Sequence, residues 1–193
     1  MRAVRDDVEV VRPADRAAWR AWLVRHHTRA DGVLVEHVRQ RSSLPGPRYE
    51  DIVEEALCFG WIDGTARSVD EDHTGLYVAP RRPGSVWAGS NKERVERLEA
   101  AGLMTEAGRA AVDRARQDGS WTVLDGPAAL LVPDDLAAAL ATASGARDGF
   151  DALAPSLRRQ LLAWVAMARR PDTRQRRIAA VVEGAREGRS PLS

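Results

Sequence analysis

The chain has 193 residues, and its hydrophobic fraction of 44% is enough for one folded domain, or for one compact domain with a helical extension, which excludes a disordered protein. Its 29 basic and 28 acidic residues nearly cancel, so no field of the whole protein indicates a nucleic-acid or membrane partner. The charge is unevenly placed, because residues 156–193 contain nine arginines and three acids whereas the first 155 residues carry a net charge of −5.

The elements of the first half alternate between helix and strand. Asp15 is a suitable N-cap for the first helix, Gly60 can end the second, and residues 70–75 have the composition of a hairpin turn. The expected elements are helices over residues 15–28 and 49–59 and strands over residues 33–38, 61–69 and 76–79.

The second half is expected to be helical. Thr105 is predicted to cap one helix, and Asp134 or Asp135 is predicted to cap another. The expected helices cover residues 92–101, 106–117, a segment from 134 onward, 156–169 and 173–187.

These patterns predict an α+β fold, in which a small antiparallel sheet of about three strands packs with helices and a helical C-terminal half follows. We expect residues 1–125 to form an α+β domain and residues 126–193 to form a helical region packed on it as one globular unit.

The location is expected to be cytoplasmic. Cys58 is the single cysteine and cannot form an internal disulfide, which is typical of a reducing compartment. The N-terminus lacks the apolar region of a signal peptide, and no apolar run approaches the roughly 18 residues of a membrane span. We therefore expect no membrane association.

Several blocks of the sequence, in order, resemble the YdeI/OmpD-associated family, whose members are often described as bacteriocin-protection proteins. The blocks are residues 49–63, residues 80–82 with Ser85, Trp87 and Asn91, residues 102–104 and 119–121, residues 133–136 and residues 168–178. The resemblance covers about residues 30–188. It implies a bacterial cytoplasmic protein of protection, stress resistance or antibiotic resistance, and it implies no particular reaction.

A candidate ligand-binding site is predicted around the arginine and tryptophan run of residues 80–91. Two guanidinium groups beside the start of a helix suit a carboxylate or phosphate, and indole rings can form an apolar wall. The predicted ligand-binding residues are Trp61, Arg81, Arg82, Ser85, Trp87 and Asn91. The structural alternative is that Asp63 pairs with an arginine, Asn91 caps its helix and the tryptophans fill the core.

Catalysis is a second hypothesis for the same region. Asp63 and His37 are the candidate acid and base, because a carboxylate and an imidazole can exchange protons near neutral pH. The histidines and Cys58 lack the spacing of metal ligands, so we expect no metal and no cofactor. Whether the protein is an enzyme stays open from the sequence.

The C-terminal arginines allow a third hypothesis. Arg158, Arg159, Arg169, Arg170, Arg174, Arg176 and Arg177 can contact the phosphates of a nucleic acid, or they can form a solvated face that pairs with the protein's own acids. The leading hypothesis is a protein that binds a small anionic or aromatic molecule or a peptide without turnover. An antibiotic-modifying or biosynthetic enzyme and a nucleic-acid-binding module are the alternatives, and the oligomeric state is not predicted.

Overall fold

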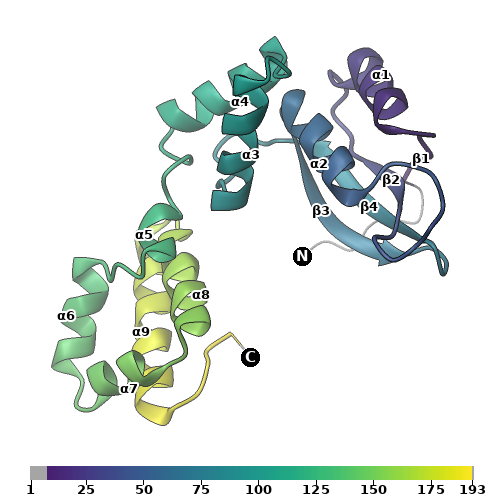
Figure 1. The fold of residues 1–193 in the computed structure, drawn as a ribbon. Helices are drawn as coiled ribbons and strands as arrows, with labels where there is room; N and C mark the ends of the chain where they lie inside the picture. The colour runs from purple at the N-terminus through teal and green to yellow at the C-terminus, as the bar shows by residue number, and fades with distance from the viewer. Residues whose placement is uncertain (1–7, 193) are drawn as a thin grey trace. The chain divides into compact units, whose positions relative to one another are not determined.

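In the computed structural model, which describes residues 8–192, a mixed sheet with helices is followed by a bundle of helices (Figure 1). The described residues divide into two compact units. The α+β unit comprises the residues up to Ser85 together with Ser90–Asp118, and the helical unit comprises Val86–Gly89 together with the residues from Gly119 onward.

Four strands form one sheet in the order β1-β2-β4-β3. The strands are β1 (Val10–Val11), β2 (Val33–Val38), β3 (Trp61–Ser68) and β4 (His73–Pro80). β1 runs parallel to β2, and the other neighbouring pairs are antiparallel. β2 is a central strand whose apolar residues are almost completely buried, which explains its continuous run of branched side chains.

A hairpin joins β3 to β4. Asp70 holds its turn, because one carboxylate oxygen accepts from the backbone N–H groups of Asp72 at 2.8 Å and His73 at 2.7 Å. The register shifts between Asp63 and Ala66, where β3 contains one more residue than β4. Such a bulge bends the strand and changes where the side chains at its start point.

Two helices, α1 (Arg16–His26) and α2 (Tyr49–Cys58), pack against each other, and α2 also contacts β2 and β3 (Figure 1). Asp15 caps α1 as predicted by accepting a hydrogen bond from the Ala18 N–H at 2.7 Å. The completely buried Trp19 of α1 donates its indole N–H to the Ile52 carbonyl of α2 at 3.0 Å. The two helices are therefore joined by both packing and a directed bond.

The α+β unit ends with α3 (Gly89–Ala100) and α4 (Glu106–Gln117). Thr105 caps α4, as predicted, and its hydroxyl also donates to the Cys58 carbonyl at 2.6 Å. A Cβ added at the buried Gly108 would overlap that same carbonyl. The absence of a side chain at this position therefore lets α4 pack directly on the end of α2.

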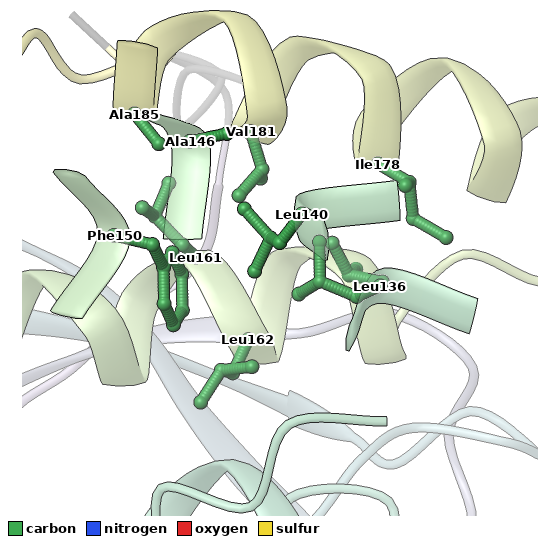
Figure 2. Packing of buried hydrophobic residues seen from close by; sticks show 10 residues of the cluster. Leu136, Leu140, Ala146, Phe150, Leu161, Leu162, Ile178, Val181 and Ala185 are labelled. Atoms are coloured by element: carbon green, nitrogen blue, oxygen red, sulfur yellow. The ribbon is translucent and has the colours of Figure 1, made fainter. Parts of the chain in front are cut away.

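The helical unit has one apolar core. Its helices are α5 (Asp125–Ala128), α6 (Asp134–Thr142), α7 (Ala146–Ala152), α8 (Pro155–Ala166) and α9 (Pro171–Glu187). Figure 2 shows ten residues of the core, which come from α6, α7, α8 and α9. Leu136, Leu140 and Phe150 are fully buried in it, so amphipathic helices rather than a sheet bury the apolar surface of this unit.

The predicted fold class is confirmed, with corrections in detail. The three predicted strands exist, but β1 adds a fourth and makes the sheet mixed. α5 and α7 had not been predicted as separate helices. The predicted caps at Asp134 and Asp135 are wrong, because α6 begins at Asp134 and Pro133 occupies the cap position. The expected boundary at residue 125 and the packing of the helical region on the first domain stay predictions.

Candidate functional site

The Pro-Arg-Arg run begins at the last residue of β4 and is held by backbone bonds. The Arg81 N–H donates to the Gly60 carbonyl at 3.0 Å, which fixes the chain after β4 beside the end of α2. Ser85 N–H donates to the Arg82 carbonyl at 3.1 Å, and Gly84 has a φ of 70° within this turn. The Gly84 N–H also bonds a carboxylate oxygen of Asp118 at 2.9 Å. The turn is therefore an ordered part of the fold, tied to both α2 and the residue that follows α4.

The two arginines of this run have different surroundings. Arg81 is 8% exposed, whereas Arg82 is exposed to solvent. Burial lowers the pKa of Arg81 to about 10, although the negative charge of Asp63 acts in the opposite direction. Arg82 therefore keeps its hydration shell, while Arg81 is a largely dehydrated guanidinium.

Other arginines of the protein differ from Arg81 in this respect. Burial also opposes the charge of Arg16, but its bonds with carboxylates raise its pKa overall. Bonds to Glu50 and Asp135 raise the pKa of Arg94 and Arg174. Among the arginines in residues 8–192 whose pKa is clearly shifted, Arg81 alone has a lowered pKa.

Asp63 lies at the start of β3 and accepts a hydrogen bond from the Tyr49 hydroxyl at 2.9 Å. Burial, together with this bond and the charge of Asp63, raises the pKa of Tyr49 to about 12, so the phenol is protonated at neutral pH. Asp63 also interacts electrostatically with both Arg81 and Arg94. Asp63 thus interacts with Arg81, and Tyr49 and Arg94 join the same group.

Asn91 joins this group from α3. It is 8% exposed, and its side-chain oxygen accepts from Arg94 at 3.1 Å. Arg94 in turn forms two bonds of 2.8 Å to the carboxylate of Glu50 on α2. Arg94 therefore connects the first turn of α2 with the first turn of α3 beside Asp63.

His37 lies on β2 and is 7% exposed. Burial lowers its pKa, the nearby charges of Arg39 and His73 act in the same direction, and a bond with the Val38 carbonyl partly opposes them. Its ring centre is 6.1 Å from the ring centre of Tyr49. Tyr49 therefore contacts both residues that the sequence nominated as acid and base.

The two tryptophans of the predicted site are each 1% exposed. Trp61 donates its indole N–H to the His27 carbonyl at 3.0 Å and lies edge-on to Trp22, within the α+β unit. Trp87 belongs to the helical unit, where its ring centre lies 4.9 Å from that of Trp121. Ser85 is half-buried at the end of the turn. Of the predicted ligand-binding residues, Trp87 lies in the helical unit and the others lie in the α+β unit.

An ion-pair network that the sequence analysis did not anticipate covers the acidic face of α2. Glu55 is 3% exposed and accepts from Arg16 at 2.7 Å and from Arg20 at 2.6 Å. Glu54 pairs with Arg16 and with Arg97 of α3. A sequence pattern could have predicted this network. The arginines lie four residues apart on α1 and three apart on α3, so each helix has a basic face that complements the acids of α2.

The C-terminal arginines form several internal contacts. Arg174 holds the Asp135 carboxylate with two bonds of 2.5 and 2.8 Å, and Arg158 pairs with Asp151. Arg177 bonds the Trp164 carbonyl, and its guanidinium lies 5.1 Å from the centre of the Trp164 ring. A substantial part of this cluster thus stabilises the helical unit itself.

The described residues offer neither a metal site nor a reactive thiol. Within residues 8–192, His, Cys, Asp and Glu side chains form no group of three arranged to hold a metal ion. Burial raises the pKa of the Cys58 thiol to about 11, so at neutral pH it is not a thiolate nucleophile. None of the helices described has the length and apolar character required to cross a membrane.

These features define an α+β protein with a buried arginine beside a Tyr–Asp pair and with an all-helical second unit. Residues 11–111, more than half of the chain, match the family described as a domain of unknown function, DUF8412, and the chain belongs to this family. Residues 129–188 match the family described as "Bacteriocin-protection, YdeI or OmpD-Associated". No curated protein and no solved structure matches the chain.

The predicted resemblance is therefore confirmed over the helical unit. The blocks at residues 133–136 and 168–178 lie inside the YdeI/OmpD-associated match. The blocks at residues 49–63 and 80–82, which were expected to belong to the same family, lie inside the DUF8412 match. The chain therefore combines two family domains in sequence.

Proposed function

We propose that the protein is a cytoplasmic protection or stress-resistance protein of the YdeI/OmpD-associated type, which binds a small anionic molecule without turnover. The proposed ligand carries a carboxylate or phosphate that lies against Arg81 and Arg82. The family match over residues 129–188 supports the general role, and the environment of Arg81 supports the anionic ligand.

The support from Arg81 is electrostatic. A guanidinium that is 8% exposed has lost most of its hydration, and its lowered pKa means that Asp63 offsets only part of this loss. A ligand anion beside Arg81 would interact with it in a region of low dielectric, where the attraction is stronger than in water. Arg82 is exposed and can make the first contact with the anion.

An aromatic ligand has less support than an anionic one. Trp61 and Trp87, which were expected to form an apolar wall, are each 1% exposed, so they offer little surface to a ligand. The proposal therefore rests on the charge of the ligand rather than on stacking.

The test is a titration of the full chain with inorganic phosphate and with benzoate, followed by calorimetry and thermal shift. We expect saturable binding of at least one anion, and we expect Arg81→Met to weaken it by at least about tenfold. Arg81→Met removes the charge and retains much of the apolar volume of the side chain, so the variant is expected to keep its fold. Arg67→Ala, which removes an exposed arginine of β3, is the matched control and should bind like the original protein.

A folded Arg81→Met variant with unchanged anion affinity would contradict the proposed site. Recovery of the bound molecule in a chemically changed form would contradict the absence of turnover. Mass spectrometry of benzoate or a phosphate ester after incubation with the protein distinguishes these outcomes.

One observation favours an enzyme as the second candidate. Tyr49 donates to Asp63 and its ring lies beside that of His37, so a single phenol contacts both proposed proton-transfer residues. Product formation that Asp63→Asn abolishes, in a variant with unchanged hydrogen exchange, would support this candidate over simple binding.

A further inference from the structure

We propose that the helical unit contains a separate binding pocket for a small neutral molecule with an apolar ring and one hydrogen-bond acceptor. This proposal does not depend on the function proposed above, because all residues that line the pocket belong to the helical unit. The lining residues are Gly126, Pro127, Leu131, Val132, Pro133, Leu162, Ala166 and Arg174.

The size of the pocket limits the ligand. Its volume is about 180 Å³. An apolar cavity of roughly 150 Å³ can hold a benzene molecule, so this pocket suits a single six-membered ring with one small substituent. A peptide segment or a helix would require a longer groove.

The chemistry of the wall is apolar with one polar position. Proline rings and branched side chains form most of the lining, and Leu162 lies at the edge of the core cluster shown in Figure 2. Arg174 supplies the polar group. Its bonds to Asp135 and to the Val165 carbonyl use three of the five N–H donors of a guanidinium.

The electrostatics of Arg174 favour a neutral ligand. Asp135 holds the guanidinium with two bonds, and this contact lowers the pKa of Asp135 and raises that of Arg174. The positive charge is therefore already balanced by a carboxylate, in contrast to the charge of Arg81. A hydroxyl or carbonyl oxygen can accept from the remaining donors without bringing a further charge.

At the rim of the pocket, a strained backbone residue stands next to an exposed apolar side chain. Leu130 has a φ of 57°, a conformation usually taken by glycine at this position of a helix end. The N–H groups of Leu130 and Leu131 bond the carbonyls of Pro127 and Gly126, as in a Schellman motif. The Leu130 side chain packs against the core, while Leu131 on the rim stays 65% exposed.

A strained backbone and an exposed apolar side chain therefore lie next to the pocket. A left-handed conformation at a leucine is strained, and strain of this kind is concentrated at ligand clamps and other functional sites. Leu131, which lines the pocket and is 65% exposed, provides a flexible apolar side chain at its rim. The strain, the cavity and the exposed rim are three independent observations at the same place.

The test uses methyl-detected NMR of the full chain during titration with benzyl alcohol and with toluene. We expect saturable shifts of the Leu131, Val132 and Leu162 methyl signals and no comparable shift at the buried core residue Leu140. Benzyl alcohol should bind more tightly than toluene because its oxygen can accept from Arg174. Equal affinities would overturn the proposed hydrogen bond, and an absence of saturable shifts for both compounds would overturn the pocket.

Ala166→Leu is the decisive variant, because its larger side chain fills the pocket and should weaken binding by at least about tenfold. Ala179→Leu, at an exposed position of α9, adds the same atoms elsewhere and should bind normally. If Ala166→Leu does not fold, Gly126→Leu serves the same purpose, since a Cβ at Gly126 has no neighbour closer than 3.9 Å. Unchanged binding in a folded filling variant would overturn the proposal.

Discussion

Glu55→Gln is expected to destabilise the α+β unit strongly. The Glu55 side chain is almost completely buried, and its carboxylate holds Arg16 and Arg20 of α1 at 2.7 and 2.6 Å. The substitution keeps the size of the side chain but removes its charge and one acceptor oxygen. It therefore tests whether the pairing of α1 with α2 depends on this carboxylate rather than on apolar packing alone.

The magnitude follows from the two bonds and their exposure. A hydrogen bond with a charged group contributes roughly 1.5–3 kcal/mol, and breaking a buried ion pair costs about 3–5 kcal/mol. The side chains of Arg16 and Arg20 are 36% and 32% exposed, so water can replace part of the lost interaction. Arg16 also keeps its bond to Glu54 at 2.9 Å. We therefore expect a loss of about 3 kcal/mol in the free energy of unfolding.

Hydrogen exchange measures this loss directly, because it reports the opening of α1 and α2 separately from the helical unit. Glu50→Gln is the matched control on the same helix, and it should cost less than about 1 kcal/mol because the Glu50 side chain is 48% exposed. Equal effects of the two substitutions would refute the argument. If Glu55→Gln does not fold, Arg20→Gln tests the same ion pair, because the Arg20 side chain is partly exposed and its replacement is milder.

Two further predictions concern the titration of His37 and the close packing of Gly149 against α9. Burial and the charges of Arg39 and His73 lower the pKa of His37, so protonation of His37 opposes folding. Urea denaturation should therefore show that the free energy of unfolding falls as the pH drops below 6.5. A His37→Gln variant should lose less stability over this range. Gly149→Ala should destabilise the helical unit by about 1–3 kcal/mol, because its Cβ would overlap a backbone carbonyl of α9. Gly126→Ala, where a Cβ has room, should be neutral or stabilising in thermal denaturation, and similar results for the two glycines would contradict the described packing.

Local patterns were sufficient to predict much of the fold. β2 has the predicted bounds because six consecutive residues form a strand that is buried on both faces. β1 was missed because its two residues contain no period, and it is defined by its register with Leu34 and Val35. The short α5 and α7 were missed for a similar reason, since four or seven residues show little amphipathic pattern.

The candidate site was harder to predict because it depends on contacts between distant elements. The sequence nominated both Asp63 and Arg81, and the two interact electrostatically in the structure. It did not predict Tyr49 or Arg94, whose contact with Asp63 depends on how α2 and α3 pack. Helical spacing identifies which residues share a face, but it does not determine which face of another helix they meet.

The contrast between Glu55 and Arg81 separates a structural charge from a candidate binding charge. Both side chains are buried, but Glu55 is held by two arginines, whereas the pKa of Arg81 is lowered despite the charge of Asp63. Removing a buried charge that serves the fold is expected to be strongly destabilising, whereas a charge that serves a ligand is expected to be replaced by an apolar residue at a lower cost in stability. If Arg81→Met proves as destabilising as Glu55→Gln, the Arg81 charge serves the fold and the proposed anion site loses its main support. If Arg81→Met is stable and loses anion binding, the fold tolerates the cost of burying Arg81 because the guanidinium binds a ligand.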